Sequence, residues 1–387
     1  MRKPKIVGID ISLMAFPGSG VGTYTYNLVK HLPKSDLFNF HLFYSSLRRP
    51  PDQLPLKSLQ KNEKKIFNYH FPRRLIEFFG NRLPVLPVEL LIGKLDLFHS
   101  SDFLRFPLIW GKGVTTVHDL TWKKFPEYHT QEIIKLHQKK MELTIKHGDF
   151  IIVDSEATKK DLFEYYPQID PKKVFKVYLG VDELFFKKAN INASHTLAQY
   201  QINSPYILYV GAIEPRKNLK TLISAYHQLI STNPQCQNIK LVIGGKMGWK
   251  NEDVYQLVKI LKLKDKVIFT GYIKQNDLPT LYQNAKVFVM PSFYEGFGLP
   301  VLEAMASNCP VISSSSSSLP EAGGKFPTYF NPSRVSELTR SLEKVLSFTI
   351  KEQESLTKAA YSWARKFTWT NTAKQTLAVY QKALDTP

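Results

Sequence analysis

The sequence predicts an α/β protein of two consecutive domains, each with a parallel sheet covered by helices. At 387 residues the chain is long for one hydrophobic core. Short apolar runs alternate with amphipathic segments of helical period, which is typical of parallel sheets. The alternation starts again after a polar stretch at 187–204. We therefore expect domains at 1–186 and 205–368, with 187–204 as the linker.

The first domain opens with a strand at 5–11, a glycine-rich turn and a helix. The turn contains Gly18, Gly20 and Gly22, and glycines let a backbone approach a ligand or a neighbouring element closely. The dinucleotide-binding fingerprint would need another glycine where this chain has Thr23. The pattern argues against a dehydrogenase and leaves a packing role and a ligand-binding role open for these glycines.

The stretch 57–94 is irregular and basic, and it interleaves cations with Phe78, Phe79 and several leucines. This pattern fits a segment that lies on an anionic membrane surface or contacts a lipid-linked acceptor. It fits equally a short helix that docks on its own domain. The membrane interpretation depends on three arginines, Arg73, Arg74 and Arg82.

Two further strands of this domain end in histidines, His99 and His118. Parallel sheets bind ligands at the carboxyl ends of their strands, so His118 could donate a hydrogen bond to a sugar hydroxyl or could be structural. We expect His99 to be structural. A helix at 130–146 and a helix capped by Ser155 follow.

The second domain repeats the order of strand, loop and helix. Its first loop, EPRKN, carries Arg216 and Lys217 directly after a strand. Two cations in this position can neutralise a departing diphosphate. A solvated turn is the alternative interpretation.

The most informative stretch runs from 287 to 306. It predicts a buried strand, an irregular turn and a helix that begins at Pro300, where a proline loses no hydrogen bond. Gly296 and Gly298 allow the turn to approach a ligand. The amides of Phe297 through Leu299 would point out of the positive helix end, which suits a phosphate.

Two carboxylates, Glu295 and Glu303, flank this turn. Since like charges repel, we expect them to accept hydrogen bonds from hydroxyls on either side of a diphosphate, one from a sugar and one from a ribose. Either acid alone would also suit a helix cap or a solvated face. Two acids around a Gly-x-Gly turn after a buried strand favour a binding site.

The segment EGFGLPVLEAMA closely resembles the signature of retaining glycosyltransferases of family 4. The segments PRKN, GKMGW, HDLTWKKFPEY and SSLPE resemble the mannosyltransferase-like branch, and the resemblance covers nearly the whole chain. It implies the GT-B architecture, in which two Rossmann-like domains face each other across a cleft. It also implies that a C-terminal helix at about 369–387 packs back on the first domain.

The resemblance implies roles for individual residues. Lys217 matches a family lysine that grips the diphosphate, and the usual arginine after the glycine is Ala212 here, so that role passes to Arg216. The implied catalytic residues are His118, Arg216, Lys217 and Glu295. The implied donor-binding residues are Gly20, Gly22, Gly296, Phe297, Gly298, Leu299 and Glu303.

The sequence contains no Asp-x-Asp motif, which glycosyltransferases of the other main fold use to hold a metal ion. Cationic side chains and a helix end can supply the positive charge here, so we expect no metal and no other cofactor. The resemblance implies retention at the anomeric carbon. We expect front-face attack, in which the acceptor hydroxyl passes its proton to the departing phosphate.

The expected reaction moves a hexose to a glycan or lipid-linked acceptor, with mannose from GDP-mannose as the favoured donor. A glucosyl- or N-acetylglucosaminyltransferase that uses a UDP-sugar is the alternative of the same fold. The net charge of +19 also fits nucleic acid or an anionic membrane. A non-catalytic nucleic-acid-binding protein is the weaker alternative, since we find no helix-turn-helix or basic–aromatic stacking motif.

The sequence favours a cytoplasmic protein, peripheral on the inner face of the membrane. Asp10 interrupts the first apolar run, so this run predicts a strand rather than a signal peptide. No segment reaches the roughly 20 apolar residues that span a bilayer. The two cysteines form no disulfide framework or metal cluster.

Overall fold

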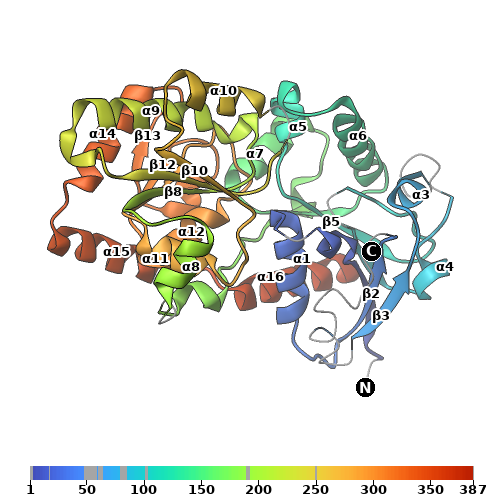
Figure 1. The fold of residues 1–387 in the computed structure, drawn as a ribbon. Helices are drawn as coiled ribbons and strands as arrows, with labels where there is room; N and C mark the ends of the chain where they lie inside the picture. The colour runs from blue at the N-terminus through green and yellow to red at the C-terminus, as the bar shows by residue number, and fades with distance from the viewer. Residues whose placement is uncertain are drawn as a thin grey trace. The chain divides into compact units, whose positions relative to one another are not determined.

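The computed structural model describes residues 3–16, 18–47, 59, 64–78, 85–100, 103–188, 192–248 and 251–386. The chain forms two compact units (Figure 1): unit 1 comprises Met1–Gly180 and Trp369–Pro387, and unit 2 comprises Val181–Thr368. Each unit is built on a parallel sheet with helices between the strands. The predicted α/β class is therefore confirmed.

Unit 1 has a parallel sheet with the strand order β3-β2-β1-β4-β5-β6-β7. Strands β4 and β6 are buried along their whole length, because helices cover both faces of such a sheet and favour continuous apolar runs. The strands are β1 (Lys5–Asp10), β2 (Phe38–Ser45), β3 (Lys65–Tyr69), β4 (Leu97–Ser100), β5 (Lys112–Val117), β6 (Phe150–Val153) and β7 (Val174–Lys176).

Two long helices of unit 1 begin directly after a capping side chain. The Thr130 hydroxyl accepts a hydrogen bond from the Ile133 amide, and the Ser155 hydroxyl accepts one from the Thr158 amide, so the predicted Ser155 cap is confirmed. The α-helices are α1 (Gly20–His31), α3 (Arg73–Glu77), α4 (Glu89–Ile92), α5 (Thr121–Lys124), α6 (Gln131–Lys146), α7 (Glu156–Tyr165) and α16 (Trp369–Asp385).

The glycine-rich turn is shorter than we predicted. Ser19 caps α1 by accepting a hydrogen bond from the Gly22 amide at 3.1 Å, so Gly20 and Gly22 lie inside the helix. A Cβ atom on Gly22 would lie 3.0 Å from the carbonyl oxygen of Leu13. Packing against the backbone before α1 therefore accounts for Gly22, and its role in donor binding stays a prediction.

The C-terminal helix α16 belongs to unit 1. It packs on α1, β5 and β6, and Figure 1 shows its red ribbon beside the blue α1. The Thr372 hydroxyl donates to the carbonyl of Tyr178 at 2.8 Å, which fixes the start of the helix.

Unit 2 has a parallel sheet with the strand order β10-β9-β8-β11-β12-β13. The strands are β8 (Tyr206–Val210), β9 (Lys240–Gly244), β10 (Val267–Gly271), β11 (Val287–Met290), β12 (Val311–Ser314) and β13 (Thr328–Phe330). The α-helices are α8 (Ala193–Gln199), α9 (Leu219–Thr232), α10 (Glu252–Ile260), α11 (Leu278–Asn284), α12 (Leu299–Ala306), α13 (Leu319–Gly323), α14 (Val335–Leu346) and α15 (Ile350–Ala364).

The predicted linker at 187–204 is wrong. The chain passes between the units at Gly180, and part of 187–204 forms α8, which packs on α11 within unit 2. Tyr200 follows this helix and donates to the Asp277 carboxylate at 2.7 Å. A helix this short shows little periodicity, so its polar composition resembles that of a loop.

The basic stretch 57–94 forms β3, α3 and α4 where the structure describes it. Arg82 and the side chains of Arg73 and Arg74, on which the membrane interpretation depends, lie outside the described residues. No described helix is both long enough and apolar enough to cross a membrane.

Candidate active site

The centre of the candidate site in unit 2 is the carboxylate of Glu295. Strands β8 and β11 are parallel neighbours, so the loops at their carboxyl ends meet. One oxygen of Glu295 lies 2.8 Å from an Arg216 nitrogen, and the other lies 2.7 Å from the Lys217 ammonium. Ser292 also donates to this carboxylate, at 2.6 Å. The structure therefore joins three of the four predicted catalytic residues in one buried ion network.

The two cations determine the ionisation of Glu295. Burial opposes its ionisation, but the charges of Arg216 and Lys217 and the hydrogen bonds from Lys217 and Ser292 outweigh this and lower its pKa to about 2. Glu295 is therefore ionised at neutral pH, and it holds both cations at the carboxyl edge of the sheet. This arrangement can stabilise negative charge that develops on a leaving group.

Glu214 is a member of this network that we did not predict. It receives a hydrogen bond from Arg216 at 2.7 Å, and Arg216 also donates to the carbonyl of Tyr294 at 2.7 Å. These contacts fix the guanidinium from two sides. The EPRKN motif contained the signal, because Glu214 precedes Arg216 by two residues.

Serines at the end of β12 and in the run that follows it bind the backbone of the Glu295 loop. The hydroxyls of Ser317 and Ser318 both donate to the carbonyl of Glu295, and Ser318 also donates to the carbonyl of Phe297 at 2.9 Å. Ser314 donates to the carbonyl of Ser292 at 2.6 Å. We interpreted SSLPE only as a family motif, whereas its serines position the loop.

Helix α12 begins at Leu299, one residue before the start that we predicted, and Pro300 is its second residue. Gly298 precedes the helix with φ +111°, a conformation that glycine adopts readily. A Cβ atom there would also lie 2.8 Å from the side chain of Leu319. The phosphate-binding role of Gly296, Phe297 and Leu299 stays a prediction.

Glu303 occupies a different environment from Glu295. It lies on α12 and accepts a hydrogen bond from the Tyr282 hydroxyl at 3.2 Å. Burial of its carboxyl group raises its pKa to about 7, the Tyr282 hydrogen bond opposes the shift, and the Asp182 charge adds to it. The two predicted acids thus differ strongly in ionisation, which favours different roles for them. The ribose contact of Glu303 stays a prediction.

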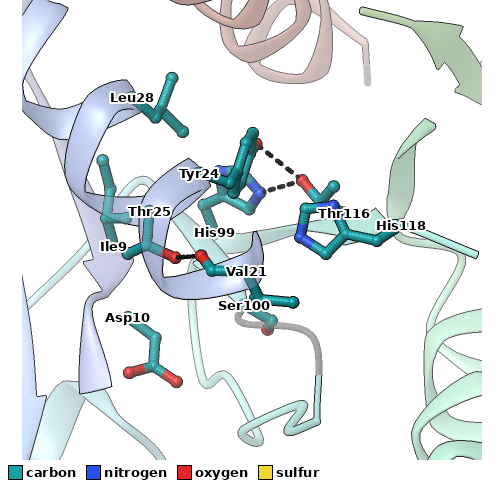
Figure 2. A pocket seen from close by; sticks show the side chains of 10 residues that line it. All are labelled: Ile9, Asp10, Val21, Tyr24, Thr25, Leu28, His99, Ser100, Thr116 and His118. Carbon is teal, nitrogen blue, oxygen red and sulfur yellow. Dashed lines mark hydrogen bonds between the residues drawn. The ribbon is translucent and has the colours of Figure 1, made fainter. Parts of the chain in front are cut away.

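The candidate residue in unit 1, His118, follows β5 and lines a small pocket (Figure 2). Its Nδ1 atom lies 2.5 Å from a carboxylate oxygen of Asp154, and its ring packs edge-on against Tyr24 with the centroids 4.7 Å apart. Asp154 follows the neighbouring strand β6, and Asp10, at the end of β1, lines the same pocket. We missed both acids, because only the strand order brings them to His118.

His99 has a structural role, as we predicted. It contacts the Tyr380 hydroxyl of α16 at 2.7 Å and the Thr116 hydroxyl at 2.8 Å, and Tyr24 contacts Thr116 at 3.0 Å. Burial, together with the charges of Lys140 and His118, lowers the pKa of His99 to about 3. This neutral imidazole ties α16 to the sheet.

Two family models match the chain. The model for Glycosyltransferase Family 4 matches residues 18–183, and the model for Glycosyl transferases group 1 matches residues 197–363. The first match contains His118, and the second contains the Glu295 network. Between them the two models cover most of both units.

The similar curated proteins include mannosyltransferases. The chain is 29% identical over 375 residues to O-antigen chain mannosyltransferase B of Escherichia coli. This match covers 95% of the chain and 97% of that protein. It is 34% identical over 251 residues to the serotype-specific mannosyltransferase WbdA of Escherichia coli, but this match covers only 62% of the chain and 29% of WbdA.

Solved structures share the fold. A glycosyltransferase from Rickettsia africae matches with a TM-score of 0.73 at 18% identity, and all of each chain is covered. HepE of Anabaena in complex with UDP-glucose matches with a TM-score of 0.70 at 18% identity, over 98% of this chain and 99% of HepE. Together with the family models, these matches show that the chain belongs to glycosyltransferase family 4 and has the GT-B fold.

Proposed function

We propose that the chain is a retaining, metal-independent mannosyltransferase that transfers mannose from GDP-mannose to a glycan or lipid-linked glycan. The Glu295 network carries this proposal, because two cations held by one buried carboxylate suit a departing diphosphate. The similarity to O-antigen chain mannosyltransferase B, which extends over 95% of the chain, supports mannose as the sugar.

Each residue has a distinct role in this proposal. Lys217 and Arg216 stabilise the diphosphate as the bond to the anomeric carbon breaks. Glu295 orients the sugar in addition to holding the two cations. Glu303 accepts a hydrogen bond from the ribose, and His118 donates one to a sugar hydroxyl.

The chemical step that we propose needs no nucleophile from the enzyme. The bond between the anomeric carbon and the diphosphate oxygen breaks, and the acceptor oxygen bonds to the same face of the sugar. The acceptor proton passes to the departing diphosphate, so charge and atoms balance. Since the positive charge comes from Arg216, Lys217 and the start of α12, the step proceeds without a divalent ion.

A UDP-sugar is the alternative donor. HepE, which shares the fold, was solved with UDP-glucose. The described residues of the Glu295 network would contact the diphosphate and the sugar, which GDP- and UDP-sugars have in common, so this network does not distinguish the bases.

A donor panel tests the proposal. The full chain is incubated with GDP-mannose, UDP-glucose or UDP-N-acetylglucosamine, each with and without excess chelator, and release of the nucleoside diphosphate is measured. We expect release from GDP-mannose at an unchanged rate in chelator, and an α-linked product by NMR when acceptor is added. Release from UDP-sugars alone would overturn the donor assignment. Loss of activity in chelator would overturn the metal-free step, and a β-linked product would overturn retention.

We also propose that the enzyme works in the cytoplasm, at the inner face of the membrane. A lipid-linked glycan acceptor would be available there.

A further inference from the structure

Unit 1 carries an exposed apolar loop at the edge where its strands begin. This loop, residues 108–112, leads into β5 and is here termed the anchoring loop. Its tip exposes Ile109 by 47% and Trp110 by 61%. The buried carboxylate of Glu89 accepts hydrogen bonds from three successive amides, those of Ile109 at 2.9 Å, Trp110 at 3.2 Å and Gly111 at 3.3 Å. The tip is thus held in place, so little conformational freedom remains to be lost on binding.

Apolar and cationic side chains surround this tip. Leu90 directly follows Glu89, which binds the tip, and is 65% exposed. The Lys94 ammonium lies 5.8 Å from the centroid of the Trp110 ring. Exposed apolar groups collected in this way commonly mark an interaction surface.

A basic hollow adjoins the loop. Leu108, Gly111 and Lys112 line it from the loop, and Lys173 and His147 line it from neighbouring elements. Lys112 donates to the carbonyl of Thr386, and Lys173 donates to the carbonyl of Gly148 at 2.7 Å, so both ammonium groups bind uncharged backbone oxygens.

The hollow keeps a positive charge. Among the described residues that line it, Asp149 is the one acid, and Arg105 binds both oxygens of this carboxylate, at 2.9 and 2.8 Å. The arginine therefore balances the acid. The positive charge of the two lysines remains.

We propose that the anchoring loop and this hollow form a docking surface for an anionic membrane. Trp110, Ile109 and Leu90 enter the interfacial layer, where a tryptophan ring and short apolar side chains are favoured. Lys112 and Lys173 contact lipid phosphates in the hollow, and Lys94 does so beside Trp110. A membrane fits better than an acidic protein, because the apolar groups project at a loop tip and the cations flank them.

The surface has a consequence for the acceptor, and this consequence rests on the proposed function. The strands of unit 1 run from this edge to the edge that carries His118, and a strand of six residues is about 20 Å long. With the strands upright on the membrane, the sugar acceptor stands about 20 Å above the lipid phosphates. A lipid-linked glycan of several sugars fits this distance, whereas a lipid with one sugar does not.

Vesicle sedimentation with the full chain, without donor or acceptor, tests the docking surface. We expect the wild type to bind vesicles of phosphatidylglycerol and phosphatidylcholine and to bind pure phosphatidylcholine at least about fivefold more weakly. Trp110→Ser should weaken binding to the anionic vesicles about tenfold, as expected for losing one buried aromatic side chain. Lys112→Glu should weaken it at least about fivefold.

Matched substitutions in unit 2 provide the controls. Ile350→Ser alters a side chain that is 78% exposed, and Lys344→Glu reverses an exposed cation, so both should bind like the wild type. Leu90→Ser replaces Trp110→Ser if the latter lowers the unfolding midpoint by more than a few degrees. The proposal is overturned if the wild type does not bind vesicles. It is also overturned if Trp110→Ser and Leu90→Ser both bind anionic vesicles as tightly as the wild type.

Two further probes separate other occupants of the surface. A thermal shift with inorganic phosphate but no vesicle binding would make the hollow a free-anion site and overturn membrane docking. Binding of polyglutamate without vesicle binding would favour an acidic protein and would also overturn it. None of these results affects the donor panel, so the transferase proposal is judged separately.

Discussion

Replacing Glu295 with glutamine is the sharpest test of the unit 2 network. The substitution keeps the shape of the side chain and removes its charge. Arg216 then retains Glu214, whereas the buried Lys217 loses the carboxylate that lies 2.7 Å from its ammonium. The expected damage is electrostatic, because the volume hardly changes.

Two independent arguments give the magnitude. Removing one partner of a buried ion pair costs about 3–5 kcal/mol. The pKa of Glu295 falls from 4.5 to about 2 on folding, which corresponds to about 3 kcal/mol of stabilisation when the group is ionised. For a folding unit of this size, we expect the unfolding midpoint at pH 7 to fall by roughly 10 °C.

The pH dependence follows from the direction of the shift. The folded-state pKa lies below the unfolded one, so the stabilisation is complete above about pH 4.5 and disappears as the pH falls toward 2. The difference between wild type and Glu295→Gln should therefore be largest near neutral pH and should shrink in acid. Circular dichroism melts of both proteins at pH 7, 5, 4 and 3 measure it.

A surface carboxylate serves as the control. Glu337 lies 3.5 Å from Arg334, which is 66% exposed, so Glu337→Gln should change stability by less than about 1 kcal/mol. Equal midpoints of Glu295→Gln and wild type at pH 7 would refute the reasoning. A difference between them that does not depend on pH would also refute it.

Three further predictions concern single side chains. Lys217→Ala should lower turnover roughly 100-fold or more through lost leaving-group stabilisation. The control Lys220→Ala, which removes an ammonium group from a side chain that is 58% exposed, should leave turnover unchanged. Release of the nucleoside diphosphate at saturating donor measures both, and wild-type turnover in Lys217→Ala would remove Lys217 from the mechanism. Glu303→Gln should raise stability at pH 8 by about 2–3 kcal/mol and leave it unchanged below about pH 4.5. The reason is that burial raises the pKa of Glu303 to about 7, so the ionised carboxylate destabilises the folded state at pH 8. Equal unfolding midpoints of the variant and the wild type at pH 8 would contradict this. Asp154→Asn should lower turnover about 10- to 100-fold by misorienting His118, whose Nδ1 lies 2.5 Å from the carboxylate. The effect on KM should be smaller, and Asp154→Glu should recover part of the turnover. An unaltered turnover number in Asp154→Asn would show that Asp154 does not position His118.

Local chemistry explains what the sequence predicted well. The strand Val287–Met290 and the Ser155 cap were predicted correctly, because apolar runs and caps act over a few residues. The errors were local as well. Helix α1 starts at Gly20 because Ser19 caps it, and α8 is too short to show a period.

The amino-acid sequence by itself determined the α/β class and the family signature, and with them the identity of Glu295, Arg216, Lys217 and His118 as candidates. Only the tertiary structure decided which partners these residues have. Glu295 meets Lys217 across 78 positions because β11 lies beside β8, and His118 meets Asp154 because β6 lies beside β5. Strand order and burial depend on the packing of the whole unit, so no local pattern in the chain encodes them.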